Sequence, residues 1–153
     1  MTPQGDLRAS TASTVSRTGA ETVAPAPSAG ATVEITTTTG KAAYTVANLR
    51  PITPVLDSEY LPVKGTLYTV DVTIQTESGN TTYNANYFNA RTEDGTNLTP
   101  DLIHVENPLN YGDLPQGQKV AGPVSFDVPH GKMIVQIVLR DPIGRQAGLW
   151  SVT

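Results

Sequence analysis

The chain has 153 residues and a formal net charge of −4, with 14 acidic and 10 basic side chains and no cysteine. This length suits one domain. The lack of cysteine excludes a disulfide framework, a Cys-ligated metal site and a thiol nucleophile. The acidic balance argues against a nucleic-acid partner, and no apolar run approaches the roughly 20 residues that span a bilayer. The 22 threonines and 15 valines instead favour strands.

Residues 1–30 differ in kind from the rest of the chain. Twenty-one of these thirty residues are Thr, Ser, Ala, Pro or Gly, so the segment offers little apolar surface to offset the entropy of ordering it. Its two acidic and two basic side chains cancel, which leaves the whole net charge on the remainder. We therefore predict a disordered tail or linker over residues 1–30 and a single domain over residues 31–153.

The start of the chain bears on its compartment. Met1 is not followed by a basic stretch and an apolar segment, so no export signal is recognised. The chain is then either intracellular or the mature form of an exported protein. Because a Ser/Thr/Ala/Pro stalk is common in exported bacterial proteins, we expect a secreted or envelope-associated protein whose export signal has been removed, with a lipoprotein precursor as one form of it.

From residue 31 the apolar residues alternate with a period of two. The first two strands are predicted over residues 32–36 and 44–49. The clearest strand is residues 67–75, in which Tyr68, Val70, Val72 and Ile74 share one face. Ser78-Gly79-Asn80 is predicted to form a turn after it.

The second half of the domain continues the pattern. Residues 83–92 are predicted to form one strand, closed by a turn at Glu93-Asp94-Gly95 and paired with a short strand around Leu98. A strand over residues 120–128 contains Pro123, which indicates a sheet edge or a bulge. Residues 133–139 are apolar on both faces, as in a central strand, and residues 149–152 form the last strand.

Seven or eight short strands without a helical segment predict an all-β fold. We expect an immunoglobulin-like antiparallel β-sandwich, with a closed up-and-down barrel as the alternative. The Cys…Trp…Cys pin of antibody domains is absent. The two sheets are therefore expected to be held together by the packing of core side chains alone. These are Tyr68, Val70, Val72, Phe88, Phe126, Ile137 and Trp150.

Three segments of the chain resemble a known family. They are Tyr87-Phe88-Asn89-Ala90-Arg91-Thr92-Glu93-Asp94-Gly95, Leu114-Pro115-Gln116-Gly117-Gln118 and Gly122-Pro123-Val124-Ser125-Phe126-Asp127-Val128. Together with Pro62-Val63-Lys64-Gly65 and Leu149-Trp150, they are similar to the mycobacterial secreted immunogenic proteins of the MPT/MPB type. The resemblance covers roughly residues 44–153 and implies an exported immunoglobulin-like antigen without enzymatic activity. It supplies no catalytic residues.

A metal site or an active site has weak support. Asp101, His104 and Glu106 are candidate metal ligands within six residues, yet we favour a solvated strand in which His104 faces water and Asp101 the opposite side. His130 is expected in an exposed turn. Ser125 is an outward strand residue rather than a nucleophile, and the carboxylates of Asp57 and Glu59 lie in a loop.

Two features favour a binding role instead. Residues 99–119 form a long connection that carries Asn107, Asn110 and Tyr111, and long loops on a rigid scaffold are often functional. Tyr83, Tyr87 and Tyr111 form a candidate aromatic patch, with packing on a sheet face as the alternative.

The sequence thus predicts a non-enzymatic secreted or cell-surface binding module. We expect a monomer without a cofactor, which binds a protein, lipid or glycan partner. The alternative is a metal-handling protein or a hydrolase that uses the Asp101, His104 and Glu106 region. A purely structural spacing role in the cell wall is a third possibility.

Overall fold

The computed structural model describes residues 27–54 and 63–152. Residues 1–26 of the tail predicted over residues 1–30 lie outside the described residues, as do Asp57 and Glu59. The regular elements are β1 (Thr32–Thr36), β2 (Gly40–Pro51), β3 (Thr66–Asn84), the 3₁₀ turn η3 (Ala85–Tyr87), β4 (Phe88–Thr92), β5 (Asn97–Leu98), β6 (Tyr111–Pro115), β7 (Lys119–Val128), β8 (Ile134–Arg140) and β9 (Gln146–Ser151).

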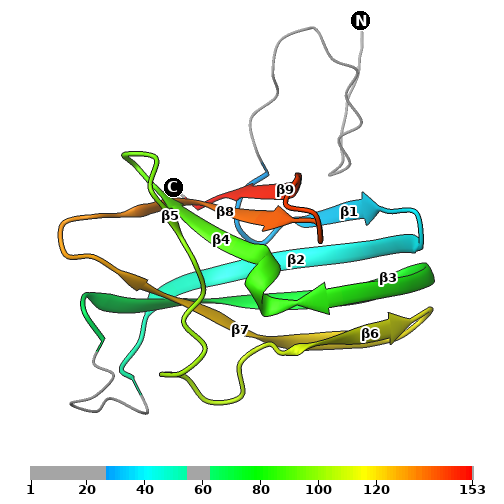
Figure 1. Ribbon diagram of the computed structural model, residues 1–153, viewed down its shortest axis with the longest axis horizontal. Coiled ribbons are helices and arrows are strands. Elements are labelled where there is room, and N and C mark those ends of the chain that lie inside the picture. The colour runs from blue at the N-terminus through cyan, green and yellow to red at the C-terminus, as the bar shows by residue number, and fades with distance from the viewer. Residues whose placement is uncertain (1–26, 55–62, 153) are drawn as a thin grey trace, which may run out of the picture.

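These strands form two antiparallel sheets that face each other (Figure 1). One sheet has the order β1-β2-β3, with β6 and β7 both paired to β3. The other has the order β5-β4-β8-β9. The predicted all-β, immunoglobulin-like sandwich is confirmed, and the two separate sheets rule out the barrel. Nine strands lie within the described residues, more than the seven or eight expected, because β6 was not recognised in the sequence.

The longest strand, β3, corrects the first predicted turn. Ser78-Gly79-Asn80 does not reverse the chain, because β3 continues for 19 residues from Thr66 to Asn84. Gly79 adopts a positive φ of 69° opposite Gly40, and the register with β2 shifts next to this pair. A Cβ on Gly40 would lie 2.2 Å from the Ser78 carbonyl oxygen. The turn residues therefore bend a continuous strand at a bulge.

The strand predicted over residues 83–92 is also wrong in part. β3 ends at Asn84, whose side-chain oxygen accepts a hydrogen bond from the Asn86 amide at 2.9 Å. The three residues of η3 then carry the chain from the first sheet to the second, where β4 begins at Phe88. Within β4 the predicted alternation is confirmed, since Phe88 and Ala90 are buried and Asn89 and Arg91 are not.

Strands β6 and β7 together pair along most of β3 (Figure 1). The predicted edge position of Pro123 is confirmed, because β7 pairs with no strand other than β3 among the described residues. The connection before β6 runs along the free side of β7. The Asp101 amide donates to the Ser125 carbonyl oxygen at 2.6 Å, and the Leu109 amide donates to that of Pro123 at 2.8 Å.

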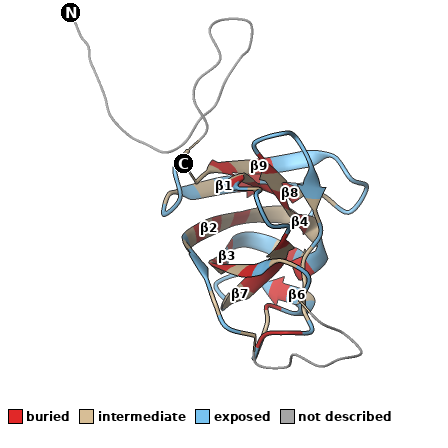
Figure 2. Cartoon of the chain, turned by 90° about the vertical axis from the view of Figure 1, so that its left-hand side faces the viewer, coloured by how far each residue is buried: buried red, intermediate tan, exposed pale blue. Residues whose placement is uncertain are grey.

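The hydrophobic core lies between the sheets (Figure 2). Six of the seven predicted core residues are buried, and Tyr68 is half-buried against them. Burial of each such aliphatic or aromatic side chain stabilises the folded state by about 1.5–3 kcal/mol relative to leaving it exposed. The largest fully buried side chains are Trp150, Phe88, Phe126, Leu67, Ile74, Leu109 and Ile137.

The first described residues join the two sheets. Ser28 forms a parallel bridge with Ser151 of β9, and the Ser151 amide donates to the Pro27 carbonyl oxygen at 2.7 Å. The Gly30 amide then donates to the carbonyl oxygen of Val46 in β2, also at 2.7 Å. The chain thus passes from the edge of one sheet to the other before β1 begins. The domain boundary at Gly30 stays a prediction.

Candidate functional site

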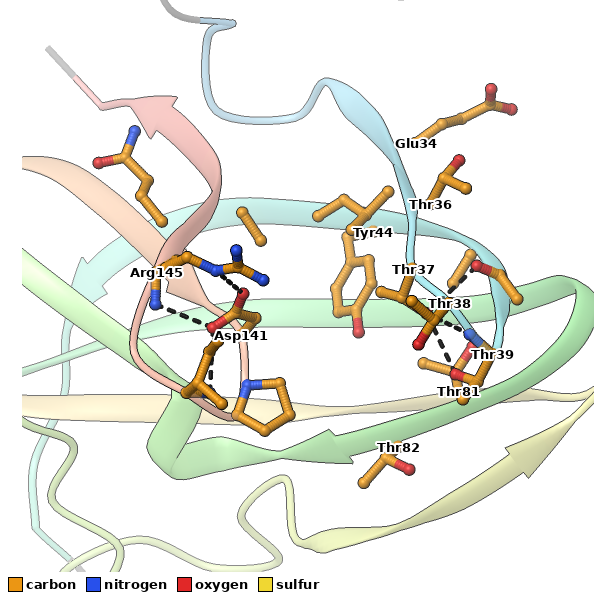
Figure 3. Close-up of a pocket in the computed structure, with 17 residues that line it drawn as sticks. Glu34, Thr36, Thr37, Thr38, Thr39, Tyr44, Thr81, Thr82, Asp141 and Arg145 are labelled. Atoms are coloured by element: carbon orange, nitrogen blue, oxygen red, sulfur yellow. Dashed lines mark hydrogen bonds and ion pairs between the residues drawn. The ribbon is translucent and has the colours of Figure 1, made fainter.

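A cleft of about 850 Å³ opens at one end of the sandwich, between the β1–β2 turn and the β8–β9 turn (Figure 3). One wall is the β1–β2 turn with its run of threonines, and the other is the β8–β9 turn. The threonines of β3 complete the floor. The lining residues are Glu34, Ile35, Thr36, Thr37, Thr38, Thr39, Gly40, Ala42, Tyr44, Thr81, Thr82, Asp141, Pro142, Ile143, Arg145, Gln146 and Ala147.

Hydrogen bonds within the threonine run shape the first wall. The Thr37 amide donates to the Gly40 carbonyl oxygen at 2.8 Å, which closes the turn between β1 and β2. The Thr37 hydroxyl also accepts from the Thr39 amide at 3.2 Å. The Thr39 hydroxyl donates to the Asn80 carbonyl oxygen at 3.1 Å, which ties the turn to β3. These short polar side chains thus stabilise a tight turn by bonding its backbone.

The second wall is a turn of the Asp-Pro-x-Gly kind. One carboxylate oxygen of Asp141 accepts from the amides of Ile143 (3.0 Å) and Arg145 (2.8 Å). Gly144 takes a φ of 91°, and its amide donates to the Asp141 carbonyl oxygen at 2.9 Å. The Asp141 side chain thus holds the backbone of the turn. The side chain of Ile143, at the tip of this turn, is 74% exposed at the mouth of the cleft.

Tyr44 of β2 lines the cleft and carries a buried polar group. Its side chain is only 6% exposed, and its ring lies 6.4 Å from that of Phe88 in the facing sheet. In Figure 3 the ring stands between the two walls with its hydroxyl directed into the cleft. Within the part of the chain that the structure describes, this hydroxyl has no hydrogen-bond partner. A buried hydroxyl without a partner is costly, and such groups often mark ligand sites.

The protonation state of Tyr44 follows from its surroundings. Burial of the phenol, together with the neighbouring Tyr87, raises the pKa of Tyr44 to about 12. At neutral pH the side chain is therefore an uncharged hydroxyl that can donate one hydrogen bond and accept another.

The charged groups around the cleft are matched with one another. Glu34 forms an ion pair with Lys41 at 3.2 Å, and Asp141 forms one with Nε of Arg145 at 3.0 Å. Desolvation opposes ionisation of Asp141, but hydrogen bonds from Arg145 and Ile143 outweigh it and lower the pKa of that carboxyl. The cleft therefore presents uncharged hydroxyls and aliphatic groups, with no unmatched charge among the described side chains that line it.

The structure does not gather the residues predicted for a binding patch. Tyr83 and Tyr87 are half-buried and pack against the core. Tyr111 is 72% exposed at the start of β6. In the ladder Tyr83 lies opposite Gly112 and Asn84 opposite Tyr111, so Tyr83 and Tyr111 project from opposite faces of the sheet.

The two predicted asparagines are exposed but play backbone roles. Asn107 adopts a positive φ of 48° in the connection that runs along β7. The carbonyl oxygen of Asn110 accepts from the Ala85 amide at 2.9 Å and so fastens this connection to η3. Their side chains are free to meet a partner, and a binding role for the loop stays a prediction.

The predicted surroundings of His104 are wrong. The residue is 4% exposed and lies in a bend rather than in a strand. One oxygen of the Asp101 carboxylate accepts from the amides of Ile103 (3.0 Å) and His104 (3.1 Å), which turns the backbone. The other oxygen lies 2.7 Å from Nδ1 of His104. The turn brings together two side chains that a strand would have separated.

Among the residues that the structure describes, Asp101 and His104 are not joined by a further acidic or histidine side chain in a metal-binding group. Glu106 is exposed, and the described residues contain no group of three His, Cys, Asp or Glu side chains that could hold a metal ion. His130 is exposed in a turn, as predicted. Ser125 does face away from the sandwich interior, but it is fully buried and donates to the Thr69 hydroxyl at 2.9 Å.

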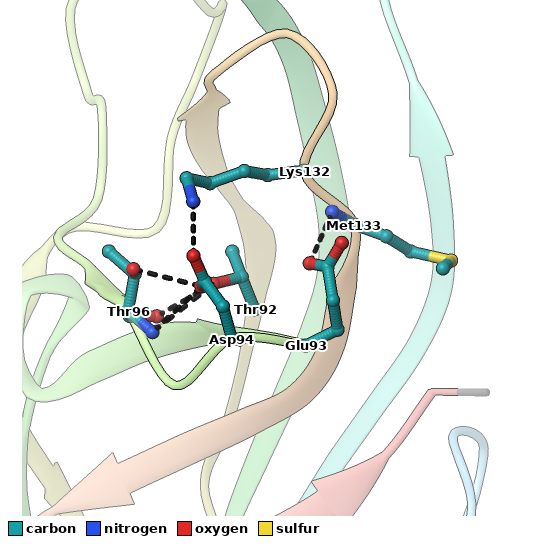
Figure 4. Close-up of polar contacts among 6 residues, drawn as sticks. All are labelled: Thr92, Glu93, Asp94, Thr96, Lys132 and Met133. Atoms are coloured by element: carbon teal, nitrogen blue, oxygen red, sulfur yellow. Dashed lines mark hydrogen bonds and ion pairs between the residues drawn. The ribbon is translucent and has the colours of Figure 1, made fainter.

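A second polar cluster joins two turns at another part of the second sheet (Figure 4). One Asp94 oxygen accepts from the Thr96 hydroxyl (2.9 Å) and the Thr96 amide (3.2 Å), and the other forms an ion pair with Lys132. The Lys132 contact is the largest cause that lowers the pKa of Asp94, followed by the bonds from Thr92 and Thr96. Both carboxylate oxygens of Asp94 are engaged within the protein, so the cluster fastens the turn at residues 93–96 to the turn that precedes β8.

Sequence reasoning missed the cleft. Its walls are two turns about one hundred residues apart, and Tyr44 looks like an ordinary strand residue. The available signals were the run Thr36-Thr37-Thr38-Thr39 and the turn sequence Asp141-Pro142-Ile143-Gly144. Both indicate turns, but neither shows that the turns meet.

The fold thus defines an immunoglobulin-like β-sandwich with an open end. Residues 24–147 match the family described as a domain of unknown function (DUF1942), and the chain belongs to that family. No curated protein matches its sequence.

Three solved structures of similar fold come from two bacteria. The secreted protein MPT63 of Mycobacterium tuberculosis is similar at a TM-score of 0.70 and 22% identity, over 86% of this chain and 99% of that one. The yjhA protein of Bacillus subtilis is similar at a TM-score of 0.56 and 18% identity, over 74% of this chain and 81% of that one. A putative lipoprotein, ycdA, of Bacillus subtilis is similar at a TM-score of 0.57 and 13% identity, over 78% of this chain and 38% of that one. These likenesses establish the fold. In the described residues no helix is long and apolar enough to cross a membrane.

Proposed function

We propose that this protein is a non-enzymatic module, secreted or held at the cell envelope, that recognises its partner at the open end of the sandwich. The observation that carries the proposal is the cleft, into which the buried hydroxyl of Tyr44 points without a hydrogen bond to any described residue. A rigid sandwich that presents a concave end suits recognition.

The solved structures of similar fold support an exported location. One is named a secreted protein and another a putative lipoprotein. With the sequence resemblance to the mycobacterial immunogenic proteins of the MPT/MPB type, they favour an exported protein, either freely secreted or held at the envelope as a lipoprotein.

The proposal excludes catalysis by the groups described above. The Asp101–His104 pair is enclosed, and the Ser125 hydroxyl donates to Thr69 rather than to a base. These side chains are engaged in holding the connection between β5 and β6 and the buried face of β7.

The test is chemical-shift mapping on the full chain labelled with ¹⁵N. Lipid, glycan and protein fractions of mycobacterial envelope and culture filtrate are added in turn. We expect one fraction to shift the amides of residues 36–40 and 141–147, and not those of residues 107–111. Shifts confined to residues 107–111 would place recognition at the loop. Turnover of a component by the purified protein would contradict the non-enzymatic role.

A further inference from the structure

The chemistry of the cleft points to one class of ligand. We infer that it binds an uncharged amphiphile, with an aliphatic chain that lies along the cleft and an ester, ketone or alcohol oxygen that pairs with the Tyr44 hydroxyl. This inference rests on the proposed function, because it assigns a ligand to the same cleft.

The hydroxyl of Tyr44 sets the polar requirement. At neutral pH the phenol is protonated, and burial raises its pKa further, to about 12, so it meets a ligand as a neutral donor and acceptor. Its side chain is 94% removed from solvent, so a partner group must leave water as well. For a neutral carbonyl or alcohol oxygen the new hydrogen bond offsets that loss, whereas an ionised group would lose far more hydration.

The surroundings of Tyr44 set the apolar requirement. Ile35 and Ala42 line the cleft from the first sheet, and Pro142, Ile143 and Ala147 line it from the second. The exposed side chain of Ile143 at the mouth offers apolar surface that water now covers. An aliphatic chain would cover these groups and gain about 25 cal/mol for each Å² of apolar surface removed from water.

The charges at the rim argue against an ionic ligand. Arg145 is engaged with Asp141, and Glu34 with Lys41. A carboxylate ligand would be repelled by the carboxylate of Asp141, which already neutralises the guanidinium of Arg145. A free sugar would find hydroxyls but few of the planar, charged or amide side chains able to bind several of its groups at once, so we rank it below the neutral amphiphile.

The probes are 1-decanoylglycerol, decanoate and maltotriose, each added to the full chain below any micelle concentration and followed by calorimetry and ¹⁵N shifts. The decanoate shares the chain of the ester but is charged, and maltotriose is a neutral polyol without a chain. We expect 1-decanoylglycerol to bind at residues 36–40 and 141–147, and decanoate and maltotriose to bind at least tenfold more weakly.

Tyr44→Phe is the matched variant, since it removes one oxygen and keeps the ring. It should weaken binding of 1-decanoylglycerol about tenfold, as expected for one buried hydrogen bond. The Tm of the free variant should equal or exceed that of the wild type, because an unpartnered hydroxyl is removed. Tyr111→Phe, outside the cleft, should change neither quantity, and Ile143→Ser should weaken binding without loss of fold.

The outcomes separate the ligand class from the proposed function. Equal binding of decanoate, or unchanged binding by Tyr44→Phe, overturns the neutral amphiphile. Binding of maltotriose alone, lost in Tyr44→Phe, also overturns it but keeps the cleft as a recognition site. Failure of all three probes overturns the inference, and failure of the envelope fractions as well overturns the proposed function.

Discussion

The indole nitrogen of Trp150 in β9 donates to the carbonyl oxygen of Ala31 at 3.0 Å. This bond joins the last strand of one sheet to the residue before the first strand of the other. The indole ring lies in the core, close to Gly148. In a chain without disulfides, this contact is one of the places where packing and a hydrogen bond together hold the sheets at a fixed distance.

Trp150→Phe should lower the free energy of unfolding by about 2 kcal/mol. The variant loses the bond to Ala31, leaves that oxygen unpaired and opens a small cavity in the core. Urea unfolding followed by far-ultraviolet circular dichroism measures the change, because the fluorescence of the single tryptophan is lost. Met133→Ala, 56% exposed before β8, is the control and should stay within about 0.5 kcal/mol. Equal effects of the two substitutions would show that Trp150 does not fasten the sheets.

Gly65→Ala tests a close approach between the start of β3 and the end of β7. A Cβ at this position would lie 1.9 Å from the Val128 carbonyl oxygen. The backbone has little room to retreat, since the amides of Lys64 and Gly65 each donate to the Asp127 carboxylate at 2.7 Å. We expect a loss of at least about 3 kcal/mol in urea unfolding.

Gly131→Ala is the matched control for Gly65→Ala. Gly131 has a positive φ of 85° but open space around it, so alanine there should cost only about 1–2 kcal/mol through backbone strain. A larger loss at Gly131 than at Gly65 would mean that the contact with Val128 relaxes easily.

Alternation along single strands predicted much of the fold. The face of β3 with Val70, Val72 and Ile74, and the central position of β8, follow from residue type alone, because period two needs only local information. The edge position of β7 follows from the one proline in it. Each of these features is a property of a segment of about ten residues.

The failures involve partners far apart in the sequence. β6 has one buried apolar residue, Leu114, and forms because β3 extends far enough to pair with it. His104 is buried because the Asp101 carboxylate turns the backbone, which changes the face on which each side chain lies. The cleft depends on where the turns at residues 36–40 and 141–147 meet, and that is fixed by the packing of the whole sandwich.

A double-mutant cycle tests the buried hydroxyl pair on the outer face of the first sheet. Ser125 donates to Thr69 at 2.9 Å, and Thr69 donates to the Val124 carbonyl oxygen at 3.2 Å. Ser125→Ala should cost about 1 kcal/mol. Thr69→Val should cost about 2 kcal/mol, because it leaves the Ser125 hydroxyl buried without its acceptor.

The double variant should lose less than the sum of the two single variants, with a coupling of about 1 kcal/mol in urea unfolding. Thr73→Val, on the same strand face but only half-buried, is the control and should be nearly neutral. Additive losses within error would show that the two hydroxyls do not act as a pair.

The Asp94 cluster predicts how stability depends on pH. The contact with Lys132 and the bonds from Thr92 and Thr96 lower the pKa of Asp94 in the folded state, while the bond to Asp94 raises the pKa of Lys132. The contribution of Asp94 is therefore complete above its ordinary pKa of about 3.9 and is lost as the pH falls below that value. The contribution of Lys132 is complete below about 10.4 and is lost as the pH rises above it.

Asp94→Asn should accordingly be less stable than the wild type by a constant amount between about pH 5 and pH 9, and the difference should shrink steadily as the pH falls below about 4. Urea midpoints measured at half-unit intervals from pH 2 to pH 9 give the comparison. The wild type keeps some further acid sensitivity in this range, because the pKa of Asp141 is lowered as well. Lys132→Met should lose less stability than Asp94→Asn, because Thr92 and Thr96 still donate hydrogen bonds to the Asp94 carboxylate. Parallel curves for Asp94→Asn and the wild type down to pH 2 would show that this carboxylate keeps its ordinary pKa and does not fasten its turn to the turn that precedes β8.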